Sequence, residues 1–192
     1  VAAALDLDDT REKLAASIVS VARQMNMLGL NQGTSGNVSA RLGKGFLITP
    51  SGVAYESLRP EDVVSVGSDG TIENGKRPSS EWRMHRDIYA SRAEAGGVVH
   101  AHPTYCTALS CLREGIPPFH YMVAMAGGVN IRCANYATFG SQELSDAMRT
   151  ALLDRCACLL ANHGMICFAT DIEAALALGI EVETLARHYC ES

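Results

Sequence analysis

The class of fold follows from one stretch of the sequence, Cys158-Leu-Leu-Ala-Asn-His-Gly-Met-Ile-Cys-Phe168. Its two apolar runs, Cys158–Ala161 and Met165–Phe168, have the length and composition of buried strands. Only Asn162-His163-Gly164 separates them, and a connection this short joins antiparallel strands, because parallel neighbours need a crossover of a dozen or more residues. The stretch therefore predicts a sheet that is mixed or largely antiparallel and not doubly wound.

Strand patterns and helix patterns are interspersed along the rest of the chain. Further strands are expected at 38–41, 46–49, 63–66, 97–102 and 131–134. Helices are expected at 10–28, 80–91, 103–113, 142–153 and from residue 170 to the end. With no internal repeat and no linker, the pattern predicts a single α/β domain over residues 1–192, with helices on both faces of the sheet in three layers.

Two of these helices carry signals for their ends. The helix at 10–28 has an apolar residue every three or four positions, Asp9 with Glu12 as a capping box, and Gly29 as a stop. The last helix is expected to begin at a capping box formed by Thr170 and Glu173.

Composition excludes several classes of protein. Of 192 residues, 47% are hydrophobic and 19% are charged, which is typical of a globular protein and not of a disordered one. The net charge of −5 argues against a nucleic-acid partner, which usually requires a basic excess. Taken alone, the same charge argues against an anionic substrate.

The expected compartment is the cytoplasm. No apolar stretch approaches the roughly 18 residues of a membrane span, so no membrane partner is expected. The start Val1–Asp6 is too short and too acidic for a signal peptide. The seven cysteines are odd in number and lie mostly in apolar runs, which indicates free thiols in a reducing compartment.

Three histidines form a candidate metal site. His100 and His102 are two apart on a predicted strand, so both imidazoles lie on the same face of the sheet. His163 lies in the break between two apolar runs, where a histidine needs a partner. Three histidines at a sheet edge suit a catalytic divalent metal with an open position. Without a metal, His100 and His102 would be two unrelated polar residues at a strand end, and His163 an ordinary turn residue.

Glu81 is the candidate fourth member of this site. It lies at the start of the helix expected at 80–91, where a carboxylate also complements the helix dipole without any catalytic role. Beside an undercoordinated metal, one carboxylate can be a ligand at rest and a general base once substrate displaces it.

Three short runs of small and hydroxyl residues are candidates for binding a phosphate. They are Thr34-Ser35-Gly36-Asn37, Ser51-Gly52 and Ser79-Ser80. Each offers backbone N–H and O–H donors with little bulk, and the last also lies at a helix start. Each run is equally well explained as a simple turn. Neither a dinucleotide-binding fingerprint nor a phosphate-binding Gly-Lys-Ser/Thr loop occurs.

Seven motifs occur in order and together resemble a known family. They are Gly29–Ser39, Leu47–Gly52, Pro78–Arg83, Val98–His102, His120–Met122, Tyr136–Gly140 and Asn162–Gly164. From about residue 12 to residue 190 the chain resembles the class II, zinc-dependent sugar-phosphate aldolases, and among them most closely the L-fuculose-1-phosphate aldolases.

The resemblance implies a function and a cofactor. The expected reaction is the reversible cleavage of a deoxyketose 1-phosphate such as L-fuculose 1-phosphate, as in fucose catabolism. The products would be dihydroxyacetone phosphate and an aldehyde such as L-lactaldehyde. The resemblance assigns Zn²⁺, or another divalent metal, to His100, His102, His163 and Glu81, and it makes Glu81 the acid/base as well.

The resemblance also implies substrate contacts and partners. The phosphate is assigned to Gly36, Asn37, Ser51, Gly52, Ser79 and Ser80, with Thr34 beside them. Tyr121 is expected to reach the site of the neighbouring subunit and act at the aldehyde oxygen, in a four-fold homotetramer with sites between subunits. Three other histidines are left out of the site. His85 and His188 lie on predicted helices and are expected to be surface or core residues, and His120 adjoins Tyr121 and is expected near a subunit interface.

The sequence departs from the family at its end, and further functions stay open. The family usually continues past the last helix with a tail that closes over the aldehyde portion, and this sequence stops at Ser192. Pentulose-phosphate 4-epimerases share the metal and phosphate site but usually have Asp at the position of Glu81. A methylthioribulose-1-phosphate dehydratase and a non-catalytic aldolase-like binding module also fit the motifs.

Overall fold

A computed structural model describes residues 2–73 and 75–192, with side chains described from residue 9 onward. Val1 and Asn74 of the predicted domain therefore lie outside the described residues. The elements in chain order are α1 (Ala2–Met27), β1 (Asn37–Leu42), β2 (Gly45–Ile48), the 3₁₀ helix η1 (Pro60–Asp62), β3 (Val64–Val66), α2 (Trp82–Ser91), β4 (Gly97–Ala101), α3 (Thr104–Leu112), the 3₁₀ helix η2 (Tyr121–Ala126), β5 (Arg132–Ala134), α4 (Gln142–Ala151), β6 (Ala157–Leu160), β7 (Gly164–Ala169) and α5 (Ile172–Glu191).

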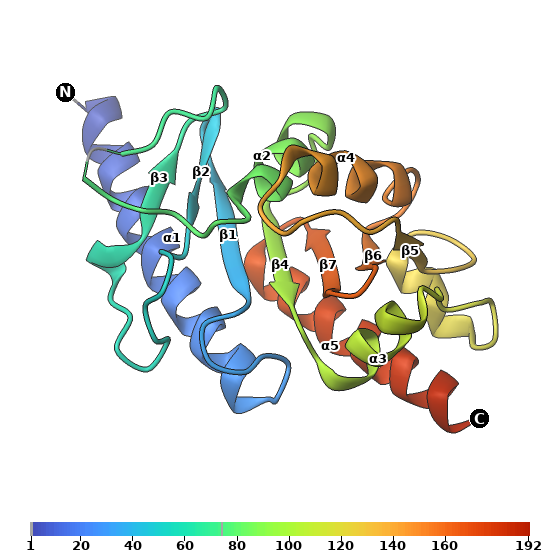
Figure 1. Ribbon diagram of the computed structural model, residues 1–192. Helices are drawn as coiled ribbons and strands as arrows, with labels where there is room; N and C mark the ends of the chain where they lie inside the picture. Colours follow the sequence, from blue (N-terminus) through green and yellow to red (C-terminus); the bar gives the residue numbers. More distant parts are fainter. Residues whose placement is uncertain (1, 74) are drawn as a thin grey trace.

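The strands of the described chain form one sheet in the order β3-β2-β1-β4-β7-β6-β5 (Figure 1). Neighbouring strands are antiparallel except for β5 and β6, which are parallel. The register of β6 and β7 pairs Leu160 with Gly164 across the short turn. The predicted mixed, largely antiparallel sheet is therefore confirmed.

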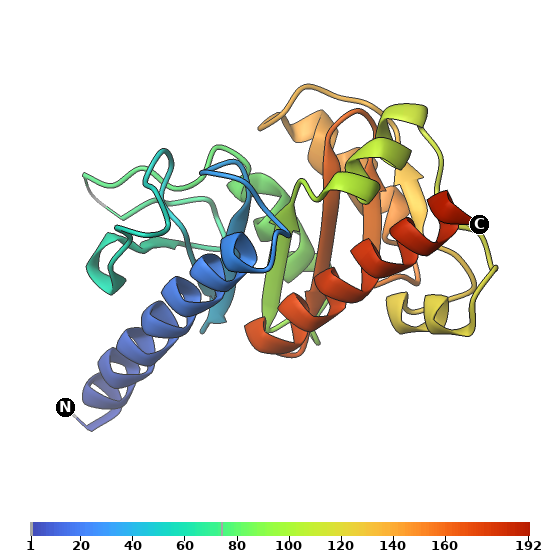
Figure 2. The same cartoon turned by 90° about the horizontal axis from the view of Figure 1, so that it is seen from below.

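Helices cover both faces of this sheet. Figure 2 shows α1 and α5 lying along the same face, and α2 and α4 lie on the other. Successive strand residues alternate between the two cores, because side chains on a strand point to opposite faces. Val99 and Cys167 pack with α1 and α5, whereas Val98 and Ile166 pack with α2 and α4. The three-layer α/β/α arrangement is confirmed.

Two predicted helix starts are wrong. Helix α1 begins at Ala2, so Asp9 is an interior residue, and its side chain pairs with Lys13 one turn later. The alanine-rich segment before Asp9 favours helix and extends it towards the N-terminus. At α5 the cap is Asp171, which accepts a hydrogen bond from the backbone N–H of Ala174 at 2.7 Å, and Thr170 precedes it. Thr170 and Asp171 are adjacent and both are residue types that cap helices, so the sequence alone does not decide which of them is the cap.

The structure bears on two expectations drawn from composition. Within residues 2–73 and 75–192, no helix has the length and apolar character needed to span a membrane. All seven cysteines are free thiols, and Cys106, Cys158 and Cys167 are buried. Burial raises the pKa of the Cys158 and Cys167 thiols, so both stay protonated and inert.

Candidate active site

The structure brings the four candidate metal ligands together. One ligand atom from each of Glu81, His100, His102 and His163 lies within 4.8 Å of all the others. His100 belongs to β4 and His102 follows its end, His163 lies in the turn between β6 and β7, and Glu81 immediately precedes α2. The cluster therefore joins three segments of the chain at one end of the central strands, on the face that α2 covers.

His100 is held with a lone pair directed into the cluster. Its Nδ1 atom lies 2.8 Å from the backbone oxygen of Met165. A carbonyl oxygen only accepts, so Nδ1 carries the proton and Nε2 of the neutral ring is the acceptor. That Nε2 lies 2.9 Å from Oε2 of Glu81 and 3.0 Å from Nε2 of His102. The Nε2 lone pair of a neutral His100 thus faces a carboxylate oxygen, an arrangement that a cation between them stabilises.

Glu81 is a buried carboxylate with an unsatisfied oxygen. It is 4% exposed, and its Oε1 atom makes no hydrogen bond although Nε2 of His163 lies 3.2 Å away. Its side chain does not cap α2, so complementing the helix does not account for its orientation. Oε2 accepts a hydrogen bond from Nδ2 of Asn37 at 3.1 Å. A buried carboxylate oxygen without a partner is costly unless a cation or proton completes it.

The pKa values in the cluster are shifted by burial and by the close contacts between the carboxylate and the imidazoles. Burial acts to raise the pKa of the Glu81 carboxyl, but His100 and His163 beside it outweigh burial and hold that pKa well below its usual range. Burial acts to lower the pKa of His100, but the Glu81 carboxylate outweighs burial and raises that pKa, so without a metal a proton can take the place of the cation. Burial lowers the pKa of His102 to about 3, and a positive charge on His100 or His163 acts in the same direction. Within the cluster, carboxylate and neutral imidazole are the forms in which these side chains bind metal.

The turn that carries His163 is fixed by α3. Asn162 adopts a left-handed conformation with φ 57°, and its backbone N–H donates to the carbonyl of Ser110 at 2.8 Å. The backbone N–H of His163 donates to Oγ of Ser110 at 3.2 Å. Arg113 donates to the side-chain oxygen of Asn162 at 3.1 Å. These contacts hold the His163 ring against His100 and His102, with ring centroids 4.9 and 4.7 Å away.

The donor set fits a divalent cation. Three imidazoles and one carboxylate are a typical set for zinc and related metals, with metal–nitrogen bonds of about 2.0–2.1 Å. The unpaired Oε1 of Glu81 and the facing lone pairs are what such an ion would satisfy. The described residues therefore contain a Glu/His metal-binding cluster.

Two of the three candidate phosphate runs lie side by side. Pro50 and Pro78 form an isolated antiparallel bridge, so the backbone N–H of Ser51 donates to Arg77, and that of Ser79 donates to Thr49, both at 3.0 Å. Ser51, Gly52 and Ser80 are exposed, while Ser79 is buried. The bridge therefore leaves Ser51, Gly52 and Ser80 at the surface beside the start of α2.

A cavity of about 490 Å³ connects the third run to the metal cluster. Its lining includes Thr34, Ser80, Glu81, His102, His163, Tyr136 and Phe139. Gly36 belongs to this run, and a Cβ there would come within 2.7 Å of the backbone oxygen of His100, so only glycine allows the loop to approach β4 this closely. Hydroxyl donors and aromatic rings thus border the same opening as the cluster.

Seven predicted site residues are not part of the lining of this cavity: Gly36, Asn37, Ser51, Gly52, Ser79, His100 and Tyr121. The side-chain amide of Asn37 is buried and fully engaged with Glu81 and His85, at 3.1 and 2.5 Å. Tyr121 is 81% exposed on η2 and borders a different cavity, formed by residues 118–129. Within one chain, the structure does not bring Tyr121 to the cluster.

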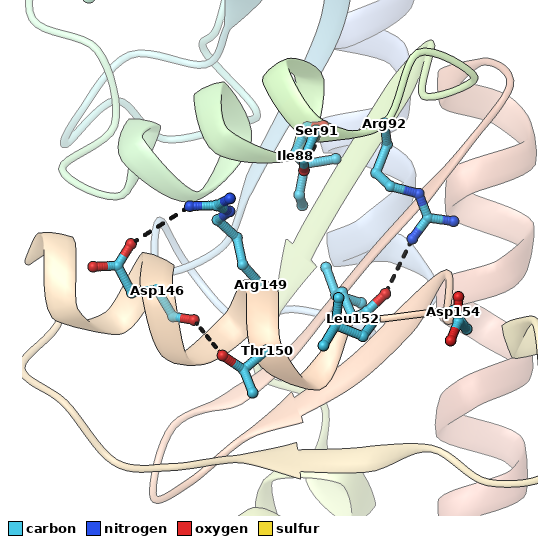
Figure 3. Close-up of a pocket in the computed structure, with 9 residues that line it drawn as sticks. Ile88, Ser91, Arg92, Asp146, Arg149, Thr150, Leu152 and Asp154 are labelled. Atoms are coloured by element: carbon cyan, nitrogen blue, oxygen red, sulfur yellow. Dashed lines mark hydrogen bonds and ion pairs between the residues drawn. The ribbon is translucent and has the colours of Figure 1, made fainter.

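A larger cavity lies elsewhere. A space of about 730 Å³ is lined by residues of α2, of α4 and of the segments that follow each of these helices. Figure 3 shows the residues that line it. The guanidinium groups of the two arginines that line this cavity already have protein partners. Arg92 donates to the backbone oxygen of Leu152 at 3.0 Å, and Arg149 lies 3.9 Å from Asp146. None of the predicted site residues lines it.

Sequence reasoning missed a buried group of polar residues behind Glu81. His85 was expected to be a surface or core residue, and it is a fully buried one that contacts both Asn37 and Ser39. Ser39 in turn contacts the hydroxyl of Tyr89. The available signal was positional: Glu81, His85 and Tyr89 are four apart on a helix.

Comparison with known proteins places these features in context. The family profile described as "Class II Aldolase and Adducin N-terminal domain" matches residues 16–190. A 5-methylthioribulose-1-phosphate/5-deoxyribulose-1-phosphate aldolase of Rhodospirillum rubrum is 51% identical over 180 residues, covering 94% of this chain and 81% of the relative. An L-fuculose phosphate aldolase of Escherichia coli K12 is also 51% identical, covering 93% of this chain and 83% of the relative.

A solved structure shows the same similarity in three dimensions. A structure titled L-fuculose 1-phosphate aldolase superposes with a TM-score of 0.90 at 37% identity, and the match covers 93% of this chain and 85% of the other. A structure of L-fuculose-1-phosphate aldolase from Thermus thermophilus superposes with a TM-score of 0.81 at 30% identity, covering 93% of each chain.

Proposed function

Because the chain belongs to the class II aldolase and adducin N-terminal domain family and is an aldolase of that family, we propose that its substrate is a deoxyketose 1-phosphate. L-Fuculose 1-phosphate is the first candidate, with dihydroxyacetone phosphate and L-lactaldehyde as products. One observation carries the proposal: the unpaired Oε1 of buried Glu81 faces the imidazole of His163 in the cluster. This is an acid/base group placed inside a metal site.

The proposed cleavage removes a proton from one atom of the substrate and adds a proton to another. Cleavage breaks the C3–C4 bond of the ketose: the C4 hydroxyl loses its proton and becomes the aldehyde, and the electron pair stays on the three-carbon fragment. A divalent cation held by the three histidines supplies Lewis-acid stabilisation of the charge that develops on the fragment's oxygens. Glu81 is proposed to take up the proton released from the C4 hydroxyl, directly or through water, and to return it to C3, which gives dihydroxyacetone phosphate with no net gain or loss of protons. Tyr121 of a neighbouring subunit is proposed to act at the C4 oxygen.

The phosphate of the three-carbon half is assigned to small residues in the loop before β1 and beside the start of α2, of which Thr34 and Ser80 line the cavity. Gly36, Ser51, Gly52, Ser79 and Ser80 offer backbone and hydroxyl donors, with Thr34 beside them. Anchoring the phosphate orients the reacting carbons, which contributes to rate. Asn37 stays in the predicted set, although its side-chain amide is engaged with Glu81 and His85.

The aldehyde half distinguishes the candidate substrates. The relatives at 51% identity are named for two different sugar phosphates. Cleavage of 5-deoxyribulose 1-phosphate would release acetaldehyde, and 5-methylthioribulose 1-phosphate would release a methylthio aldehyde. Tyr136 and Phe139, 58% and 69% exposed, border the cavity with apolar surface that suits all three deoxygenated ends. We rank L-fuculose 1-phosphate first and the methylthio and deoxy pentuloses second.

Other reactions are weaker proposals. An epimerase or a dehydratase would use the same cluster, but the relatives at 51% identity and the structure at 37% identity are all named aldolases. A non-catalytic module would have no use for four converging metal ligands. Zinc as the metal, a homotetramer with shared sites and a cytoplasmic location remain part of the proposal.

Substrate profiling tests the proposal. Purified protein with measured metal content is given the three sugar phosphates separately, and products are identified by NMR and by enzymatic detection of dihydroxyacetone phosphate. We expect dihydroxyacetone phosphate in each case, with the highest kcat/KM for L-fuculose 1-phosphate. A preference for a pentulose phosphate would move the second candidate to first place. An epimerised or dehydrated product without cleavage would contradict an aldolase.

A further inference from the structure

Two polar stripes face each other behind Glu81. Asn37 and Ser39 are two apart on β1 and therefore point to the same face of the sheet. Glu81, His85 and Tyr89 are four apart at and within α2 and lie along one side of that helix. The stripes interleave: Asn37 contacts Glu81 and His85, and Ser39 contacts His85 and Tyr89. We call these five residues the polar ladder.

Chemistry fixes the direction of every hydrogen bond in the polar ladder. The Glu81 carboxylate only accepts, so the amide nitrogen of Asn37 is the atom that faces it, at 3.1 Å. The amide oxygen of Asn37 then faces Nε2 of His85 at 2.5 Å, and this oxygen also only accepts. His85 must therefore carry its proton on Nε2.

The same logic continues to the far end of the ladder. A neutral His85 with a proton on Nε2 accepts at Nδ1, so the hydroxyl of Ser39 donates to it at 2.6 Å. The Ser39 oxygen then accepts from the hydroxyl of Tyr89 at 2.8 Å. Each donor points towards Glu81, and aligned hydrogen bonds in a buried chain polarise and strengthen one another.

Burial keeps the polar ladder in this state. His85 and Ser39 have no exposed surface, and Asn37 is 2% exposed. Burial, with a smaller contribution from His100, lowers the pKa of His85 to about 3, so the ring is neutral at ordinary pH. Arg41 closes the ladder, with its guanidinium 4.8 Å from the centre of the Tyr89 ring.

We propose that His85, Ser39 and Asn37 are positioning residues that aim and hold the Glu81 carboxylate through one directional chain of hydrogen bonds. The role of Glu81 as acid/base rests on the proposed function, whereas the hydrogen-bond direction does not. If the His85 ring adopted the other tautomer, Asn37 would have to turn its amide over and present its oxygen to the carboxylate. Glu81 would then lose a donor and gain a repulsive contact, and its orientation towards the substrate would change.

The tautomer of His85 is measured directly by NMR. Protein labelled with ¹⁵N at histidine gives long-range nitrogen–proton spectra that distinguish the two neutral tautomers, and His85→Gln identifies the His85 signals by their loss. We expect His85 as the neutral Nε2–H tautomer between pH 6 and 8, in wild type with or without added metal. A neutral Nδ1–H tautomer, or a charged ring, would overturn the proposal whether or not the protein is an aldolase.

Kinetics with matched variants test the positioning role. Ser39→Ala and Ser145→Ala each remove a fully buried hydroxyl that makes hydrogen bonds next to α2, but only Ser39 belongs to the polar ladder. We expect a several-fold lower kcat for Ser39→Ala with little change in KM, and a near wild-type kcat for Ser145→Ala, at similar losses of Tm. Equal kcat for the two variants would overturn the positioning role.

Two variants of His85, His85→Phe and His85→Gln, test its role against wild type. His85→Phe keeps the ring and removes both nitrogens, whereas His85→Gln can still offer an N–H to Asn37. We expect kcat to fall by about 10-fold or more in His85→Phe with KM changed less than about twofold, since the change affects the transition state. His85→Gln should recover most of that loss. A kcat in His85→Phe equal to wild type, per folded and metal-loaded chain, would contradict the proposal. If no sugar phosphate is cleaved by wild type, the proposed function fails while the tautomer result stands.

Discussion

Nε2 of His100 lies 2.9 Å from Oε2 of Glu81, and both side chains are almost completely buried. Since Nδ1 of His100 is committed to the carbonyl of Met165, this short distance sets a lone pair against a carboxylate oxygen. Such a contact is unfavourable without a cation or a proton between the groups. The positions of His100 and Glu81 therefore require a cation or a proton between them, which favours a metal site here.

Removing a histidine of the cluster should remove the metal. We expect His102→Ala and His163→Ala to bind less than about a tenth of the divalent metal bound by wild type at equal free concentration, since losing one of about four ligands weakens a site strongly. His188→Ala, an exposed histidine outside the cluster, is the control and should bind normally. The measurement is metal per chain after dialysis. Normal metal content in both cluster variants would place the metal elsewhere.

Glu81→Gln should abolish most of the activity and leave the fold intact. Glutamine keeps the size of the side chain and an oxygen that can accept from Asn37, but it cannot transfer a proton. We expect kcat to fall by about 10²–10⁴-fold, the usual contribution of a general acid or base. Circular dichroism and Tm should stay close to wild type. A kcat within about threefold of wild type for a metal-loaded variant would remove Glu81 from the catalytic step.

His85 should make the fold sensitive to acid. Its pKa is lowered to about 3 in the folded state, while an unfolded histidine has a pKa near 6.5, so below pH 6.5 the unfolded chain binds one more proton. Stability is then lost as pH falls, with a slope of about 1.4 kcal/mol per pH unit between pH 6 and 4. We expect the free energy of unfolding of His85→Phe to fall less steeply than wild type by this amount. The check is urea unfolding of metal-free protein, and parallel curves would contradict it.

Local patterns allowed much of this structure to be predicted. The two-residue spacing placed His100 and His102 on one face because strand geometry is local, and the short Asn162–Gly164 connection required antiparallel β6 and β7. The meeting of Glu81 with the histidines follows from packing of α2 on the sheet, which spacing does not encode. For the same reason the contacts between β1 and His85 were missed. The proposed role of Tyr121 depends on a second subunit, which no single-chain argument places.

The conformation of Asn162 should matter to the turn before His163. Its φ of 57° is tolerated by asparagine and glycine, whereas a β-branched residue pays about 1–2 kcal/mol there. We expect Asn162→Val to lower the free energy of unfolding by about that amount and to weaken metal binding, because the turn carries His163. Asn162→Gly is the matched control for the backbone and should bind metal normally. Both quantities come from chemical unfolding and metal titration, and equal behaviour of the two variants would contradict the role of the turn.

A negative charge at the proposed phosphate site should weaken substrate binding. Ser80 is exposed and borders the cavity, so Ser80→Asp introduces charge without disturbing the core. We expect KM for the sugar phosphate to rise by about 10-fold or more from repulsion of the phosphate. Ser80→Ala, which removes only the hydroxyl, should change KM much less. An unchanged KM in Ser80→Asp would move the phosphate away from this helix start.

Release of dihydroxyacetone phosphate from L-fuculose 1-phosphate tests the central claim most directly. The rate is measured for one preparation in three states: as metal-loaded, after removal of the metal by a chelator, and after zinc is restored. We predict rapid release, a loss of about 100-fold or more on stripping, and recovery with zinc, as Lewis-acid catalysis requires. Full activity in protein shown to be metal-free, or no dihydroxyacetone phosphate from the fully loaded enzyme with this substrate or either pentulose phosphate, would contradict the account.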